Sequence, residues 1–276
     1  MKPADPIDAG RLTLALNELR LPAIKTIWPD FAVRADKEGW PAARFLAALT
    51  EHELAERSSR RIQRHLEEAR LPPGKTLDSF EFDAVPTVSK AQVMALAAGD
   101  SWLDNGANLL MFGPPGGGKS HLAAALGLAL VENGWRVFFA RTTDLVQRLQ
   151  TARRDLQLEA AIARLDKYHL LTLDDLAYVT KDQAETSVLF ELISARYERR
   201  SLLITANQPF GKWGRIFPDQ AMTLAAVDRL VHHATIFEMN VESYRRRTAI
   251  ERKRGPGRPP HTRDEQDLSL IAAPPN

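Results

Sequence analysis

Residues 113–120, which read Gly-Pro-Pro-Gly-Gly-Gly-Lys-Ser, constrain the fold of this chain more than any other segment. They match the pattern G-x-x-x-x-G-K-[ST] of the phosphate-binding P-loop. Glycines allow backbone conformations in which successive N–H groups converge on phosphate oxygens. The motif therefore predicts a nucleotide site, and the residues expected to form it are Gly113, Pro114, Pro115, Gly116, Gly117, Gly118, Lys119, Ser120 and His121.

The last two residues of the motif indicate ATP and Mg²⁺ as the ligands. Lys119 supplies a positive charge for the β- and γ-phosphates, and the Ser120 hydroxyl can join the Mg²⁺ shell. An apolar run at 108–112 precedes the loop, and an Ala/Leu-rich run at 121–131 follows it. Strand, loop and helix in this order form the structural context that a P-loop requires.

Similar apolar runs recur along the chain and alternate with helical patterns. This alternation predicts an α/β fold in which a parallel sheet of five strands lies between layers of helices. The expected strands cover residues 109–112, 137–140, 169–173, 202–206 and 235–240.

The region before the P-loop is predicted to be helical from residue 11 to residue 70. Leu12, Leu16 and Leu19 follow helical spacing, and the Pro-Pro-Gly at 72–74 ends the pattern. We expect four regions. The first is a small all-α domain for DNA binding or assembly at 1–72. A linker at 73–107, with a helix at 90–98, begins the P-loop module, and the P-loop core covers 108–248. The last region is a basic tail at 249–276 that is expected to be disordered.

Composition excludes several classes of protein. The chain has 276 residues and no cysteine, so disulfides and thiolate metal sites are excluded. It has neither an apolar run of membrane-spanning length nor a signal-peptide pattern at its start. We therefore expect a cytoplasmic protein with no membrane partner. The formal net charge of +2 is too small to indicate a nucleic-acid partner by itself.

Two adjacent acids follow the third expected strand. Asp174 and Asp175 end the run Leu-Leu-Thr-Leu-Asp-Asp, which is the Walker B arrangement. Asp174 is expected to hold Mg²⁺, and Asp175 to polarise the water that attacks the γ-phosphate. A lone Asp after a strand often caps a turn, but an acidic pair that accompanies a P-loop forms one constellation with it.

Two further residues are candidates for catalysis. Asn207 follows the fourth expected strand, where ligands of open α/β sheets gather, although an Asn turn before Pro209 explains it equally well. Arg229 lies on an expected helix and is a candidate arginine finger, with a surface salt bridge as the alternative. His232 and His233 suggest a metal pair, but no further ligands accompany them in the sequence, which favours ordinary core or surface histidines.

With these motifs assembled, the chain resembles IstB, the ATP-binding helper of insertion-sequence transposition, in the AAA+ clade that includes the DnaC and DnaI helicase loaders. The resemblance runs from about residue 14 to residue 247. Besides the P-loop, it rests on the blocks 17–23, 119–127, 171–176, 196–199, 205–210 with Trp213, 228–233 and 243–245.

The resemblance implies an AAA+ core without the usual helical lid, preceded by the helical domain. It makes Asn207 the sensor I residue, Arg229 the arginine finger and Arg245 a sensor II or phosphate-proximal arginine. It also implies a homo-oligomer that assembles on duplex DNA with ATP, deforms the DNA, and presents it to a partner transposase, IstA. The chain departs from the family pattern at Gly117, Ser120 and Val241; the last of these puts the placement of Arg245 in doubt.

Basic residues mark the expected DNA contacts. Helical spacing places four arginines on one face, where they can follow a phosphate backbone or pair with neighbouring glutamates. They are Arg57, Arg60, Arg61 and Arg64. The pair Arg153 and Arg154 can line a central channel or belong to a solvated helix face. The Gly-Arg-Pro at 257–259 resembles an AT-hook, against a merely solubilising tail.

Two other functions compete with the transposition helper. A helicase loader would carry a helicase-binding helix in the N-terminal domain and would grip single-stranded DNA. The block at 17–23 and the arginine-rich helix resemble the transposition helper instead. A metabolic P-loop kinase would need an acceptor site or a lid motif, and the sequence shows neither.

Overall fold

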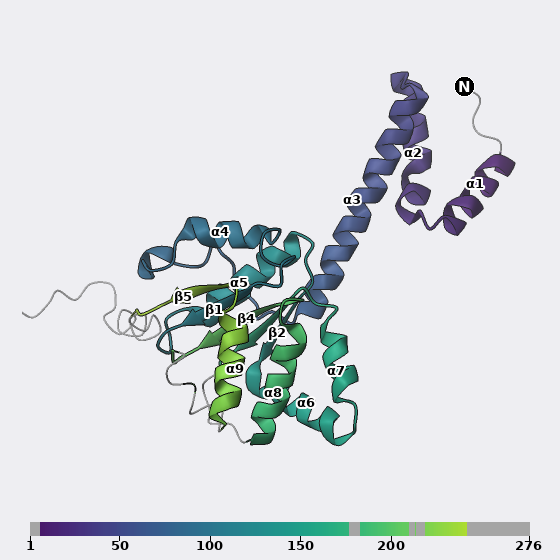
Figure 1. Cartoon of the computed structure of the whole chain (residues 1–276). Coiled ribbons are helices and arrows are strands. Elements are labelled where there is room, and N and C mark those ends of the chain that lie inside the picture. Colours follow the sequence, from purple (N-terminus) through teal and green to yellow (C-terminus); the bar gives the residue numbers. More distant parts are fainter. Residues whose placement is uncertain (1–5, 177–182, 210–212, 214–218, 242–276) are drawn as a thin grey trace, which may run out of the picture.

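The structure is a computed structural model that describes residues 6–176, 183–209, 213 and 219–241 (Figure 1). Arg245 and the basic tail lie outside the described residues.

The core is one parallel sheet of five strands in the order β2-β3-β4-β1-β5 (Figure 1). Its fold agrees with the α/β expectation, and each strand boundary lies within two residues of the predicted one. The largest differences are at the fifth strand, which begins one residue earlier and ends two residues earlier than predicted. The strands are β1 (Asn108–Phe112), β2 (Val137–Arg141), β3 (Leu170–Asp174), β4 (Ser201–Ala206) and β5 (Ala234–Glu238).

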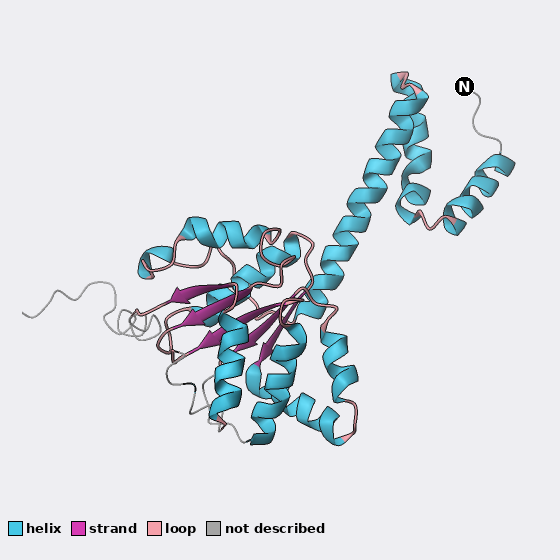
Figure 2. Cartoon of the chain, viewed as in Figure 1, coloured by secondary structure: helices cyan, strands magenta, loops and turns pink. Residues whose placement is uncertain are grey.

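Helices cover both faces of this sheet, as Figure 2 shows. Side chains alternate along each strand, so Leu110, Leu171 and Ile204 pack on one helical layer, while Leu109 and Leu203 pack on the other. Burial on both faces explains why these strands are continuous apolar runs. The first layer contains α6 (Thr142–Arg154), α7 (Leu158–Leu165), α8 (Gln183–Arg196) and α9 (Gln220–Val231), and the second contains α4 (Lys90–Ala98) and α5 (Lys119–Glu132).

Parallel pairing gathers the functional motifs at one edge of the sheet. The carboxyl ends of all five strands lie at the same edge, and ligands of such sheets bind there. The P-loop follows β1, Asp174 ends β3, and Asn207 follows β4. The predicted nucleotide residues therefore converge because of topology, although they are far apart in the sequence.

The described part of the N-terminal region, from residue 6, consists of three helices. The last of them projects from the core (Figure 1). They are α1 (Pro6–Glu18), α2 (Pro22–Glu38) and α3 (Ala42–Ala69). α3 has 28 residues, which corresponds to a length of about 42 Å. Ile62 and Leu66 pack at its base against the core, whereas Leu49 packs farther out with Leu16 and Ile24 in a small cluster of its own.

A buried carboxylate joins α2 to α3. Glu53 of α3 is 3% exposed and accepts hydrogen bonds from the backbone N–H groups of Ala23 (2.9 Å) and Ile24 (3.1 Å), in the first turn of α2. Arg57 pairs with the same carboxylate at 2.9 Å. Burial opposes ionisation of Glu53, but the hydrogen bonds from Arg57, Ile24 and Ala23 outweigh it and hold its pKa below the usual value.

A buried arginine fixes the opposite edge of the sheet, where the strands begin. Arg196 at the end of α8 is 1% exposed and donates to the carbonyl oxygens of Leu165, Tyr168, His169 and Ser201. Burial lowers its pKa to about 9. These bonds tie the α8–β4 turn to the segment that leads into β3. Within the described residues, every helix is too short or too polar to cross a membrane.

Replacing Glu53 with alanine should loosen the N-terminal helices. The change leaves two α2 N–H groups and the Arg57 guanidinium without their acceptor, so we expect a loss of about 2 kcal/mol or more in the free energy of unfolding. Thermal denaturation followed by circular dichroism measures it. Glu56→Ala, an exposed neighbour on α3, is the control, and equal melting temperatures for the two variants would contradict this role of Glu53.

The difference in stability between the wild type and Glu53→Ala should be smaller in acid. The folded-state pKa of Glu53 is lower than its usual value of 4.5, so its contribution is complete above that value. It is lost as the pH falls through the lowered folded-state pKa. The gap between the melting temperatures of wild type and Glu53→Ala should therefore narrow in strong acid.

Candidate active site

The P-loop is enclosed by neighbouring segments that leave no room for side chains at two glycines. A Cβ on Gly113 would collide with the carbonyl oxygen of Met239, just past β5. Gly118, at the start of α5, has a φ of +90°, and a Cβ there would lie 3.0 Å from the Phe80 ring. The loop thus has to be glycine at these positions because of backbone conformation and close packing.

Lys119 lies inside the loop that it belongs to. It is 5% exposed, and its Nζ donates to the carbonyl oxygens of Gly113 (2.7 Å) and Pro114 (2.9 Å). Ser120 follows it in the first turn of α5, where backbone N–H groups have no partner within the helix and favour an anion. The Lys119 ammonium group and the N-terminus of α5 therefore lie together at the P-loop, where both favour an anion.

The two Walker B acids lie at the end of β3 in different environments. Asp174 is 6% exposed, and its Oδ1 accepts a 2.6 Å hydrogen bond from the Thr205 hydroxyl. The same hydroxyl oxygen accepts the N–H of Asp175 at 2.9 Å. Asp175 is exposed and has a φ of +58°, so the chain turns sharply after Asp174. A buried oxygen donor and an exposed carboxylate match the two roles expected of the pair.

Thr205 contacts both Walker B residues, and the sequence analysis did not single it out. It is fully buried on β4, and β4 pairs with β3. Its hydroxyl holds the Asp174 carboxylate and the Asp175 backbone N–H, and such contacts fix the orientation of a potential ligand. A threonine within an apolar strand carries no local signal of this role, because the partner strand is only brought alongside by folding.

Asn207 lies at the expected edge of the sheet. Its side-chain oxygen is buried, and among the described residues it has no hydrogen-bond partner. A buried acceptor in this state is costly unless a ligand or water satisfies it. This favours a ligand-directed role over a simple turn before Pro209. Trp213 packs close by, with its indole donating to the Gln208 carbonyl oxygen at 3.1 Å.

Arg229 lies at the opposite edge of the sheet from the P-loop of the same chain. It is in the last turn of α9, just before β5 begins, so it is near the amino ends of the strands. Its guanidinium lies 5.1 Å from the Phe190 ring centre and donates to the Ala225 carbonyl oxygen at 2.9 Å. In the part of the chain that the structure describes, Arg229 forms no ion pair.

His121 contacts the segment before the core. Its Nε2 lies 3.0 Å from the Ser79 hydroxyl and 3.3 Å from the Thr76 carbonyl oxygen, and its ring packs against Phe80. Burial lowers the pKa of the His121 imidazole. In this conformation His121 supports the segment that carries Phe80 over the P-loop.

The four arginines of α3 divide into two kinds. Arg57 is engaged, because it pairs with Glu53 and donates to the Arg20 carbonyl oxygen at 2.6 Å. Arg60 is 3.9 Å from Glu53 and half-exposed, and Arg61 and Arg64 are exposed. An open hollow of ≈ 800 Å³ runs along this face, lined by Leu54, Arg57, Ser58, Arg60, Arg61, Gln63 and Arg64.

The expected pair on α6 is also divided. Arg153 donates to the Ser187 hydroxyl at 2.9 Å and forms an ion pair with Glu191, so it ties α6 to α8. Arg154 is exposed and contacts Thr151. Arg153 is therefore occupied within the chain and is a weaker candidate for a DNA contact than the sequence suggests.

Comparison with known proteins agrees with this geometry. A family model described as "IstB-like ATP binding protein" matches residues 14–252. A protein from Sinorhizobium fredii that is named as an insertion-sequence ATP-binding protein is 77% identical over 267 residues, covering 97% of this chain and 90% of its own length. One from Geobacillus stearothermophilus, named for insertion sequence IS5376, is 35% identical, with coverages of 84% and 92%.

Solved structures show the same fold at low sequence identity. DnaA from Aquifex aeolicus has a TM-score of 0.53 and 18% identity, and the match covers 67% of this chain and 55% of that protein. DnaI has a TM-score of 0.51 and 16% identity, with coverages of 62% and 95%. The chain therefore belongs to the IstB-like ATP-binding protein family, and it is an ATPase built on the AAA+ fold.

Proposed function

We propose that this protein is an ATP-dependent helper of transposition that assembles on duplex DNA, remodels it, and recruits and stimulates a partner transposase. The observation that carries the proposal is the position of the arginine face. Arg60, Arg61 and Arg64 lie on a helix that projects from the ATPase core and line an open hollow, although Arg60 also forms a long ion pair with Glu53. Backbone phosphates are the ligands that such a row of exposed guanidinium groups fits best.

The nucleotide chemistry follows from the edge of the sheet. The phosphates of ATP would draw Lys119 away from its loop carbonyls, while the helix N-terminus at Ser120 faces the same anion. Asp175 would polarise the attacking water, and Asn207 would orient it with a side-chain oxygen that otherwise lacks a partner.

Mg²⁺ fits the oxygen donors at this edge. The buried carboxylate of Asp174 and the hydroxyl of Ser120 are hard oxygen ligands of the kind that Mg²⁺ binds together with substrate phosphates. When bound, the ion would neutralise charge on the phosphates. The Thr205 hydroxyl would hold the Asp174 carboxylate in its ligating position.

The position of Arg229 supports a homo-oligomer. Because this arginine lies at the edge opposite the P-loop of its own chain, it can serve as a finger only in the site of a neighbouring copy. ATP bound between copies would then control assembly, and hydrolysis would reverse it.

A transposase is the proposed partner because the relatives are named as proteins of insertion sequences. A helicase loader is the second candidate, and the likeness to DnaI concerns the fold alone. The two functions differ in the nucleic acid that they hold, since the helper binds duplex DNA and the loader binds single strands.

Replacing Thr205 with valine should slow ATP hydrolysis and raise the Mg²⁺ concentration that it requires. Valine keeps the shape but removes the hydroxyl that joins Asp174 and Asp175, so a loss of about 10- to 100-fold is expected, with ATP binding little changed. Steady-state hydrolysis across a Mg²⁺ titration measures it. Thr205→Ser should recover most of the activity.

Thr172→Val is the matched control for this variant. Thr172 is a fully buried threonine on β3 whose hydroxyl has no hydrogen-bond partner within the described residues. If both valine variants change the Mg²⁺ requirement equally, Thr205 has no special role at the site.

Arg229→Ala should lose hydrolysis by a factor of about 10³ or more, as removal of an arginine finger does elsewhere. Asp175→Asn should also be inactive, but for a different reason, since it keeps the finger and lacks the catalytic carboxylate. Mixing the two proteins should restore activity, because the finger of one completes the intact site of the other. A mixture no more active than its components would refute a finger in trans.

Duplex DNA with ATP tests the proposed function itself. With ATP, the protein should retard duplex DNA more strongly than single-stranded DNA in a gel-shift experiment. ATP should strengthen the binding of duplex DNA by the wild type, and Lys119→Ala should lose this effect. Replacing Arg60, Arg61 and Arg64 with glutamine should weaken the binding of DNA. The slope of log K against log salt concentration should become less steep by about 2–3.

The control for the DNA experiment removes the same charge elsewhere. Arg148 of α6, Arg164 of α7 and Arg199 after α8 are exposed and are not among the expected DNA contacts, so their replacement by glutamine should leave binding nearly unchanged. Equal weakening by both triple variants would show that the α3 face is not the site. A preference for single strands would favour the helicase loader.

A further inference from the structure

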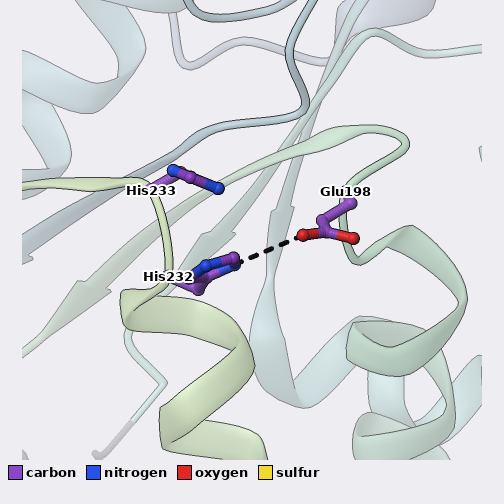
Figure 3. A group of neighbouring side chains, drawn as sticks. All are labelled: Glu198, His232 and His233. Atoms are coloured by element: carbon purple, nitrogen blue, oxygen red, sulfur yellow. Dashed lines mark ion pairs between the residues drawn. The ribbon is translucent and has the colours of Figure 1, made fainter.

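Three potential metal ligands come together at the edge of the sheet where the strands begin, away from the P-loop. Glu198 lies in the turn between α8 and β4, and His232 and His233 lie between α9 and β5 (Figure 3). One ligand atom from each residue lies within 4.8 Å of the others. The sequence showed only the two adjacent histidines, and folding supplies the carboxylate.

The geometry between two of these residues fits a transition-metal ion. His232 Nδ1 lies 3.4 Å from Glu198 Oε1 (dashed in Figure 3). Two ligands at about 2.0–2.1 Å from one tetrahedral ion are about 3.3 Å apart, so little movement is needed. The His232 and His233 rings are 3.9 Å apart between centres, which brings a third donor to the same place.

The kind of donor decides which cation fits. Two imidazoles and one carboxylate suit Zn²⁺ and similar divalent transition metals, whereas Mg²⁺ and Ca²⁺ prefer all-oxygen sites. The three side chains are exposed, so water can complete the coordination. The Tyr197 hydroxyl lies 2.9 Å from His232 Nδ1 and would give up this contact to the ion.

Hydrogen bonds of the buried Asn108 hold the backbone beside the ligand residues. Asn108 donates its backbone N–H to the His233 carbonyl oxygen at 3.3 Å and its side-chain N–H to the Leu230 carbonyl oxygen at 3.1 Å. Its side-chain oxygen accepts the N–H of Leu202 at 2.9 Å. The first residue of β1 thus links the segment that carries the histidines to the start of β4, and Arg196 fixes the α8–β4 turn that carries Glu198. A site with a fixed backbone binds a metal at lower entropic cost.

We propose that Glu198, His232 and His233 form a binding site for Zn²⁺ or a divalent transition metal of similar preference. The site is independent of the ATP and DNA sites proposed above. An ion here would join the end of α9 to the α8–β4 turn. Arg229 precedes His232 by one helical turn, so the ion would also fix the helix end that presents this arginine.

Titration of the full-length, tag-free protein with Zn²⁺ tests the site. Isothermal titration calorimetry in excess Mg²⁺ should give one Zn²⁺ per chain, and Glu198→Gln, His232→Gln and His233→Gln should each weaken binding at least about tenfold. Zn²⁺ should raise the melting temperature of the wild type and have a smaller effect on the variants. Melting curves in a chelator show whether each variant is folded.

Two variants elsewhere serve as matched controls. Glu51→Gln and His52→Gln remove a carboxylate and an imidazole from α3 and should bind Zn²⁺ as the wild type does. The proposal is wrong if the wild type shows no saturable binding, or if the three site variants bind as tightly as these controls. Binding of half an equivalent would mean that two copies share one ion, and it would also contradict a site within one chain.

Discussion

The parallel pairing of β1 with both β4 and β5 is the constraint on which the rest of the structure depends. At its carboxyl end, β1 leads into the P-loop between the ends of β4 and β5. The Met239 carbonyl oxygen lies against Gly113 and leaves no room for a side chain there. At its amino end, Asn108 joins the start of β4 to the segment before β5 through three hydrogen bonds. One buried strand therefore positions residues at both edges of the sheet.

The two edges have different chemistry because the strands are parallel. The carboxyl edge gathers backbone N–H groups, Lys119 and the Walker B acids, and is suited to a nucleotide. The amino edge gathers the end of α9 with Arg229 and the buried Arg196. In the proposed oligomer these two edges meet across an interface between copies. The parallel topology allows this arrangement because it places Arg229 and the P-loop at opposite edges of the sheet.

Much of this could be predicted from the sequence because the signals are local. A P-loop, an apolar strand ending in two acids, and Asn207 after another strand each lie within a few adjacent residues. Strand boundaries were close for the same reason, since strands buried on both faces are apolar throughout. The arginine face was also visible, because helical spacing alone places its members together.

The remainder depends on neighbours that only folding supplies. Thr205 matters because β4 lies beside β3, and Glu198 matters because the α8–β4 turn reaches the end of α9. For Arg57 the sequence left open a DNA contact or a pair with a neighbouring glutamate. It pairs with Glu53 four residues away, and burial of Glu53 against the first turn of α2 is the part that no local pattern shows. Arg153 forms an ion pair with Glu191 on another helix. These contacts of Thr205, Glu198, Glu53 and Arg153 join segments that are far apart in the sequence.

The length of α3 has a mechanical consequence. Ile62 and Leu66 anchor its base to the core, so about twenty residues, or about 30 Å of helix, extend beyond the anchor. A rigid rod of this length converts a rotation of about 10° at the base into a displacement of about 5 Å at its far end. α1 and α2 travel with it, because Glu53 binds α2 to the rod. A small rotation at the contacts of α3 with α5 and β2 would therefore move the outer end of the helix by several times the shift at its base.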